Sequence, residues 1–350
     1  MVRRDHWSEV TIRFPLNHWY VGAYRNEVGR SPLARTLLGL PVVLYRTVAD
    51  RVAAVAGSCP HRGYPMSRGT LVDGGIRCGY HGLTFADGSG LCQSPAVAEA
   101  GSAPVQLRQF PVREAGPFVW VWLGDPELAG AAAVPGGEDL GFGAAAWRAD
   151  PTGYLYVRAR YRMLCDNLLD TTHIDFVHAG SLGRAPLLFE QTRGPSPERI
   201  GVTRESRANP AALFADLFPG GDGPVDVTIG SEFCGPGFIV AVRTEFAQTA
   251  PGRASAPFAT MTFVHAITPE TARSTHYFPA FARDFRLDDE RFSAEMNARN
   301  LVVASEDKAA VESIEAVAGA GDHGAGFSLP GDAVALLAGD AIAHLVDRER

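Results

Sequence analysis

Two short pairs of cysteine and histidine constrain this chain more than any other feature. The first pair is Cys59 and His61, and the second, after 16 intervening residues, is Cys78 and His81. Thiolate sulfur and imidazole nitrogen are soft or borderline ligands, so four of them in two tight pairs indicate a metal site. The surrounding sequence is rich in Gly and Asp and is typical of hairpins. The pattern therefore predicts two loops that share one metal centre.

The order of the ligands within each pair separates two kinds of metal site. In a zinc finger the Cys ligands form one pair and the His ligands form another. Here each pair mixes one Cys with one His. A Rieske [2Fe–2S] cluster has two Cys on one iron and two His on the other, so each loop gives one ligand to each iron. The mixed pairs favour a Rieske cluster, and a tetrahedral zinc site is the alternative.

The segments "CPHRG" and "CGYHGLTF" resemble the Rieske family closely. Respiratory-type Rieske proteins join the two loops by a disulfide at positions that hold Tyr64 and Tyr80 here. They also carry Ser and Tyr donors where this chain has Leu83 and Phe85, which donate no side-chain hydrogen bond. Fewer hydrogen bonds to the cluster sulfurs lower the reduction potential. The resemblance implies an oxygenase-type cluster that passes electrons to a second metal.

A second possible metal site lies in "DNLLDTTHIDFVH", residues 166–178. The apolar spacing over residues 164–180 predicts a helix there. His173 and His178 would be about 140° apart on a regular helix. They can bind one ion only if the helix is distorted or ends between them. Two His suit a 2-His-1-carboxylate iron site, which leaves positions open for O2 and substrate. Two helical histidines with unrelated roles are the alternative.

The third ligand of such a site would be a distant carboxylate, and the best source is "SEDKAAVESIEAV", residues 305–317. The candidates are Glu306, Asp307, Glu312 and Glu315. A solvated helix face is the simpler interpretation for Glu312 and Glu315. We select Asp307 as the carboxylate ligand.

Nearly the whole chain resembles the Rieske non-haem iron oxygenases, and within them the vanillate O-demethylase and dicamba monooxygenase group. The segments that carry this resemblance are "FPLNHWYVGAY", "PLARTLLGLPVVLYR", "NLLDTTHIDFVH", "ITPETARSTHYF" and "SEDKAAVESIEA". In that group the Asp of the "ED" pair is the iron carboxylate, which supports Asp307 over Glu306.

The resemblance implies the terminal oxygenase component of a multicomponent monooxygenase. NAD(P)H electrons would arrive through a separate ferredoxin or flavin reductase, pass through the cluster and reach a mononuclear Fe(II). There O2 would be used to O-demethylate or hydroxylate a small aromatic substrate. C–H hydroxylation of a natural product is the alternative, and an electron carrier or sensor without oxygenase activity is a further one. The chain has no G-x-G-x-x-G motif between a strand and a helix, which agrees with a separate electron donor.

The resemblance also implies a homotrimer arranged head to tail, with the cluster of one subunit facing the iron of the next. Asp170 is then expected to bond His173 on its own side and His81 of the partner subunit, and so to link the two redox centres. Asn167 matches an Asn near the iron and is expected to line the pocket, with a capping or packing role as the alternative.

Substrate-pocket candidates come from "FVHAITPETARSTHYF", which contains His265 and His276. Residues two apart share a face of a strand, so His265 lies on the same side as Phe263 and Ile267. Either histidine could bond a carboxylate or phenol oxygen of the substrate, and a satisfied core or surface histidine is the alternative. The remaining cysteines have no ligand spacing and are interpreted as small buried hydrophobes: Cys92, Cys165 and Cys234.

Composition excludes several classes of protein. The chain has 350 residues, of which 46% are hydrophobic and 20% charged, as in a globular protein. A formal net charge of −7 argues against nucleic acid as a partner. No apolar run approaches the roughly 18 residues that span a membrane, and the N-terminus has no signal-like apolar region. Five scattered cysteines do not form a disulfide framework, so we expect a cytoplasmic protein.

Strand and helix patterns predict an α+β chain. Residues 1–127, with strand-like runs such as "PVVLYRT" and "FVWVWL", predict an all-β Rieske domain. Residues 128–146 are rich in Ala and Gly and predict a linker or crossing. Residues 147–350 predict a catalytic domain with a curved antiparallel sheet flanked by helices, which is a helix-grip-like arrangement. In it, "YLYVRARYRM" at 154–163 reads as a strand, and residues 288–317 and 331–350 read as helices.

Overall fold

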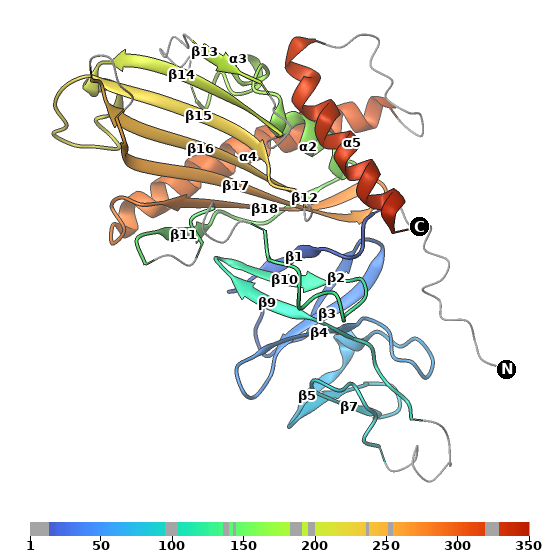
Figure 1. Ribbon diagram of the computed structural model, residues 1–350. Helices are drawn as coiled ribbons and strands as arrows, with labels where there is room; N and C mark the ends of the chain where they lie inside the picture. The colour runs from blue at the N-terminus through green and yellow to red at the C-terminus, as the bar shows by residue number, and fades with distance from the viewer. Residues whose placement is uncertain are drawn as a thin grey trace. The chain divides into compact units, whose positions relative to one another are not determined.

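The computed structural model describes residues 14–94, 104–135, 140–142, 145–182, 191–194, 200–235, 238–250, 255–318 and 329–349. The chain divides into two compact units. One contains the chain up to Val134 with Thr268–Thr275 and the end of the chain from Leu345, and the other contains Pro135–Ile267 and His276–His344. The predicted α+β class is confirmed, with an N-terminal β domain followed by a sheet with helices (Figure 1).

Three small antiparallel sheets make up the first unit. Their strand orders are β1-β10-β9, β2-β3-β4-β8 and β5-β6-β7. The bounds are β1 Trp19–Tyr24, β2 Leu33–Leu37, β3 Leu40–Arg46, β4 Val52–Ala56, β5 Thr70–Val72, β6 Gly75–Arg77, β7 Thr84–Ala86, β8 Gln109–Phe110, β9 Val112–Ala115 and β10 Phe118–Trp122, with the 3₁₀ helix η2 at Met66–Arg68. Strands β1 and β10 are buried along their whole length, because both consist almost wholly of apolar and aromatic residues.

An eight-stranded sheet forms the second unit, in the order β11-β18-β17-β16-β15-β14-β13, with β12 paired to β18. The bounds are β11 Arg148–Pro151, β12 Leu155–Val157, β13 Gln191–Arg193, β14 Gly201–Asn209, β15 Val225–Phe233, β16 Ile239–Gln248, β17 Pro257–Thr271 and β18 Ser274–Arg283. The long strands from β15 to β18 belong to the antiparallel sheet predicted for residues 147–350.

The helices are α2 Tyr161–Leu169, α3 Ile174–Val177, α4 Glu290–Ala318 and α5 Ala333–Arg348, with 3₁₀ turns η3 Ala211–Phe214 and η4 Pro330–Asp332. Two local predictions were wrong. The strand predicted over 154–163 is β12 followed by the start of α2, and the helix predicted over 164–180 is interrupted between α2 and α3. None of the helices in the described ranges could cross a membrane.

Helices α2 and α4 cover the same face of the large sheet. The aromatic rings of Phe263 on β17 and Phe281 on β18 pack with Phe292 of α4. Ser231 of β15 donates its hydroxyl to the Leu168 carbonyl of α2 at 2.8 Å. Ser231 pairs with Val242, which in turn pairs with Phe263, and directly paired residues share a face. We call this side of the sheet the helix-covered face.

Candidate metal centres

The two cluster loops have the same backbone design. Cys59 accepts a hydrogen bond at its carbonyl from Gly63 N at 2.8 Å, and Cys78 accepts one from Gly82 N at 3.1 Å. Cys59 N donates to the Tyr64 carbonyl, just as Cys78 N donates to the carbonyl five residues later. Both glycines have a φ of 71°, in the left-handed region that favours glycine. Gly63 and Gly82, which follow the two histidines in the sequence, are therefore required by the turns that present the ligands.

The four predicted cluster ligands lie together in these loops. Cys59 and Cys78 are buried free thiols, whereas His61 and His81 are exposed. The two imidazoles approach with Nδ1 atoms 3.1 Å apart. Burial raises the pKa of the Cys59 thiol to about 11, so an adjacent cation is needed to hold it as a thiolate. Two thiols inside and two imidazole nitrogens outside are the donor set that fits a Rieske cluster.

Tyr64 and Tyr80 occupy the positions where a respiratory-type protein has its inter-loop disulfide. Their ring centroids are 5.6 Å apart, so the two loops are joined here by packing of aromatic rings. The Tyr80 ring also lies against His81, with centroids 3.9 Å apart. These two tyrosines therefore brace the loops and one of the cluster histidines.

The helix break between α2 and α3 is what brings the two other histidines together. Helix α2 ends at Leu169, and Asp170 after it is extended, with φ −85° and ψ 111°. The next helix, α3, is a single turn with His173 at its beginning and His178 at its end. The convergence thus comes from a short helix with one histidine at each end, not from distortion of a longer helix.

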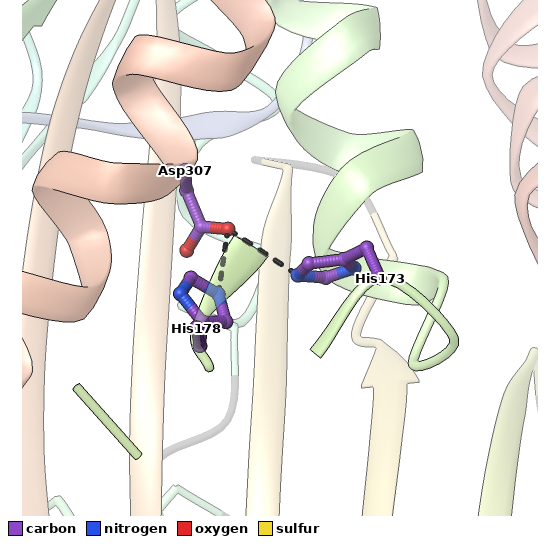
Figure 2. Close-up of side chains that lie close together, drawn as sticks. All are labelled: His173, His178 and Asp307. Carbon is purple, nitrogen blue, oxygen red and sulfur yellow. Dashed lines mark hydrogen bonds and ion pairs between the residues drawn. The ribbon is translucent and has the colours of Figure 1, made fainter. Parts of the chain in front are cut away.

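Asp307 of α4 faces both histidines (Figure 2). Its Oδ1 atom lies 3.1 Å from His178 Nε2 and 3.4 Å from His173 Nε2. The ligand atoms of the three residues all lie within 4.8 Å of one another. His178 and Asp307 are buried, with 2% and 1% of their surface exposed. Burial would raise the pKa of Asp307, but its contacts with His173, His178 and Asn167 outweigh burial and hold this pKa well below its usual range.

The hydrogen-bond partner of each histidine Nδ1 atom shows why this arrangement fits a cation. His173 Nδ1 is 2.5 Å from the Asp170 carbonyl, and His178 Nδ1 is 2.8 Å from Glu306 Oε2. Carbonyl and carboxylate oxygens only accept hydrogen bonds, so each Nδ1 carries the proton. In the neutral imidazoles, both Nε2 lone pairs then face the Asp307 carboxylate. Three acceptors pointing at one another repel unless a cation lies between them, and two nitrogens with one carboxylate suit Fe(II).

Asn167 and Asp170 both lie beside this group. Asn167 donates its amide to Asp307 Oδ1 at 2.6 Å. The Asp170 carboxylate accepts hydrogen bonds from the main-chain N and the hydroxyl of Thr172, at 2.8 and 2.7 Å. The expected contact between Asp170 and His173 is therefore made by the main-chain carbonyl and not by the carboxylate, because Thr172 engages the latter.

The two pocket candidates lie on opposite faces of the sheet. His265 is on the helix-covered face with Phe263, and its Nδ1 lies 2.6 Å from the Tyr277 hydroxyl. Burial lowers the pKa of His265 to about 4, so the ring is neutral. His276 is one residue from Tyr277 and points the other way, where its Nδ1 lies 2.8 Å from the Tyr154 hydroxyl. The expectation that His276 lines the pocket therefore fails, because strand alternation turns it away from Asp307.

Other sequence-based interpretations can be placed as well. Glu312 accepts hydrogen bonds from Arg158 N and Lys308. Glu315 is buried and forms an ion pair with Arg160 at 2.8 Å, so the solvated-face interpretation was wrong for this residue. Glu306 was considered only as a metal ligand, and its contact with His178 was missed. Its adjacency to Asp307 on α4 was the one available signal.

Comparison with known proteins gives two family matches. Residues 18–111 match the Rieske [2Fe-2S] domain, and residues 157–348 match the vanillate O-demethylase oxygenase C-terminal domain. The oxygenase component of dicamba O-demethylase from Stenotrophomonas maltophilia is 34% identical over 314 residues, covering 87% of this chain and 89% of the relative. A vanillate O-demethylase oxygenase subunit from a Pseudomonas strain is 34% identical and covers 78% of each chain.

A solved structure agrees with these matches. Dicamba monooxygenase with non-heme iron and dicamba superposes with a TM-score of 0.74 at 31% identity, covering 96% of this chain and 98% of the other. The redox groups of this chain are thus a Rieske [2Fe–2S] cluster and a mononuclear non-haem iron, with O2 as co-substrate. A separate reductase or ferredoxin supplies its electrons, and its substrate is a small molecule. The chain belongs to the Rieske non-haem iron oxygenases, in the group of vanillate O-demethylase and dicamba monooxygenase, and is the terminal oxygenase component of a multicomponent monooxygenase.

Proposed function

We propose that this oxygenase O-demethylates a small aromatic substrate at an iron held by His173, His178 and Asp307. The convergence of these three ligand atoms within 4.8 Å carries the proposal. Two of the relatives are named as O-demethylases of aromatic compounds, dicamba and vanillate. The bound iron would supply activation of O2. Cys59, His61, Cys78 and His81 would hold the cluster that delivers the electrons.

The protein residues around the iron would position it and keep water out. Asn167 holds the Asp307 carboxylate in place through its amide, and the Asp170 carbonyl holds His173. The site lies between α4 and the helix-covered face, whose strands are mostly apolar. Aromatic rings such as Phe263 lie on the same face of the sheet, which favours an aromatic compound as the substrate.

His265 is the proposed substrate-orienting residue. It is neutral, it lies on the helix-covered face, and the hydroxyl of Tyr277 fixes its ring. A neutral imidazole recognises a carboxylate or phenol oxygen by one hydrogen bond and not by charge. His276 provides a matched control because it is also buried and also bonds a tyrosine, but on the opposite face. We expect His265→Ala to raise KM at least about tenfold through the lost hydrogen bond, and His276→Ala to leave it nearly unchanged.

Hydroxylation of a methyl group is a second candidate reaction. A relative from Comamonas testosteroni, 31% identical over 87% of this chain, is named as the iron-sulfur subunit of a toluene-4-sulfonate monooxygenase system. In both reactions O2, two electrons and two protons yield one water and one hydroxylated carbon. A hydroxylated methyl ether then breaks into formaldehyde and a phenol, whereas a hydroxylated aryl methyl group remains an alcohol.

Product analysis tests the proposed function and separates these reactions. The oxygenase, a reductase and NAD(P)H would be incubated with a panel of methoxylated and methylated aromatic acids. Stoichiometric formaldehyde and phenol would support O-demethylation, and an alcohol would support the second candidate. Consumption of NAD(P)H without product from any panel member, by protein with about two iron atoms per chain, would support an electron carrier instead.

The route of electrons is a further part of the proposal. We propose a head-to-tail homotrimer in the cytoplasm, in which Asp170 links His173 to His81 of the partner subunit. The exposed imidazoles of His61 and His81 support this, because another subunit can reach them. All five cysteines are free thiols, which is in keeping with a reducing compartment. We also propose that residues 1–127 form the Rieske domain, that residues 147–350 form the catalytic domain, and that residues 128–146 link them.

A further inference from the structure

Each of the three proposed iron ligands is held by another group, and the three groups differ in chemistry. His173 donates its Nδ1 proton to a neutral main-chain carbonyl, that of Asp170. Asp307 receives a hydrogen bond from the neutral amide of Asn167. His178 donates its Nδ1 proton to a carboxylate, that of Glu306. The two histidines therefore have unequal support.

Glu306 and Asp307 clamp the His178 ring from two sides. They are consecutive residues of α4, so their side chains leave the helix about 100° apart. Glu306 Oε2 lies 2.8 Å from Nδ1 of His178, while Asp307 Oδ1 lies 3.1 Å from Nε2. The Glu306 side chain is 30% exposed and that of Asp307 is 2% exposed. One acid therefore lies on the metal side of the ring, and the other lies behind it at the rim of the site.

Ser181 fixes the position of the Glu306 carboxylate. Its hydroxyl donates to the same Oε2 atom at 2.6 Å. Ser181 follows His178 by three residues, and its N also donates to the His178 carbonyl at 3.2 Å. Glu306 thus accepts two hydrogen bonds from one short segment and holds the end of α3 against α4.

We propose that Glu306 is a positioning residue for the mononuclear iron. Its carboxylate accepts the Nδ1 proton of His178, which leaves the Nε2 lone pair free to bind the metal and strengthens its electron donation. His173, supported only by a carbonyl, is the weaker donor of the pair. The inference rests on the ligand set proposed above, and it adds a residue that neither binds the metal nor contacts the substrate.

Cobalt binding tests this role without relying on turnover. Co(II) would replace iron in the mononuclear site of the full-length protein, with its dissociation constant measured by competition against a chelator. Proton NMR would follow the exchangeable, hyperfine-shifted N–H signals of the two histidines. We expect Glu306→Ala to weaken Co(II) binding about 10–100-fold and to remove the His178 signal by exchange with water. The His173 signal should persist in the same sample.

Two further variants sharpen the test. Glu306→Gln keeps an acceptor oxygen at the same distance, so it should retain the His178 signal and weaken Co(II) binding less than the Ala variant. Glu295→Ala is the matched control, because Glu295 lies on the same helix and forms an exposed ion pair with Arg291. It should bind Co(II) like the unaltered protein.

The possible failures are distinguishable. If His173→Ala leaves Co(II) binding unchanged, the proposed ligand set is wrong. If His173→Ala abolishes binding while Glu306→Ala binds Co(II) within about twofold of the unaltered protein and keeps both N–H signals, the role of Glu306 is overturned. Loss of the His178 signal in the Gln variant as complete as in the Ala variant would likewise contradict the acceptor role.

Discussion

The two metal centres of this chain are built in contrasting ways. The cluster loops place their two histidines 20 residues apart in sequence, on turns of identical backbone design. The mononuclear site joins His178 to an aspartate 129 residues later, and it depends on a helix break and on packing against a sheet. The cluster histidines are exposed, whereas His178 and Asp307 are buried. The exposed centre suits electron exchange with other proteins, and the buried one suits chemistry away from water.

The strongest way to test this contrast is to remove one centre at a time. We expect Asp307→Asn to lose the mononuclear iron and all product formation, because two histidines and an amide bind Fe(II) poorly. Iron content should fall from about three to about two atoms per chain, with the cluster spectrum unchanged. Cys59→Ser should do the reverse and lose the cluster while retaining Co(II) binding at the mononuclear site. Loss of both centres in either variant would show that the two are not independent.

Asp307→Asn needs a control for the change of charge. Asp340→Asn removes an exposed carboxylate from α5 and should leave iron content and product formation unchanged. Iron is counted by atomic emission, and the cluster by its visible absorbance.

A smaller effect is expected where the two centres communicate. Asp170→Asn should keep both metals and yet slow cluster oxidation in a single turnover by at least about 100-fold, because it removes the carboxylate that would bond His81 of the partner subunit. Stopped-flow absorbance of the reduced cluster mixed with O2 and substrate measures this rate. Thr172→Val is the matched variant, since it removes the hydroxyl that holds the Asp170 carboxylate. If the Asp170→Asn protein oxidises its cluster at the normal rate, the bridging role is refuted.

The smallest effect concerns stability at the buried site. The folded-state pKa of His265 is about 4, below its ordinary value of 6.5, so the unfolded chain binds the proton first as pH falls. Stability should therefore decrease between pH 6.5 and pH 4, by about 3 kcal/mol from this residue alone. Urea unfolding at pH 7 and pH 4.5 should show a weaker pH dependence for His265→Leu than for the unaltered protein. Equal pH dependence in both proteins would contradict the neutral, buried state.

The sequence predicts the cluster site better than the iron site, because the cluster ligands are close together in the chain and the iron ligands are not. Cys59, His61, Cys78 and His81 are close in sequence, and local turns alone bring them together, so their spacing is informative. The pairing of His173 with His178 was visible, but the interruption of the helix at Asp170 was not, because the residues around it have helical spacing. Asp307 was selected among four acids, and the resemblance to a known group supported it over Glu306.

Tertiary contacts explain the remaining failures. Glu315 looked like a solvated acid until Arg160, 155 residues earlier, provided a buried partner. His265 and His276 both lie in strands, and only the packing of β17 and β18 against α4 decides which one faces the iron site. The residue pattern shows which side chains share a face, but not which face the helices cover.

The aromatic contact between Tyr64 and Tyr80 has a consequence for how the cluster is made. A disulfide between the loops would require an oxidant before the loops could close, and a reducing cell would reopen it. Two phenol rings in tilted contact close the loops as soon as the chain folds, and no redox reaction is needed. The loops of this oxygenase can therefore receive or lose a cluster under reducing conditions without any change in covalent bonding outside the cluster itself.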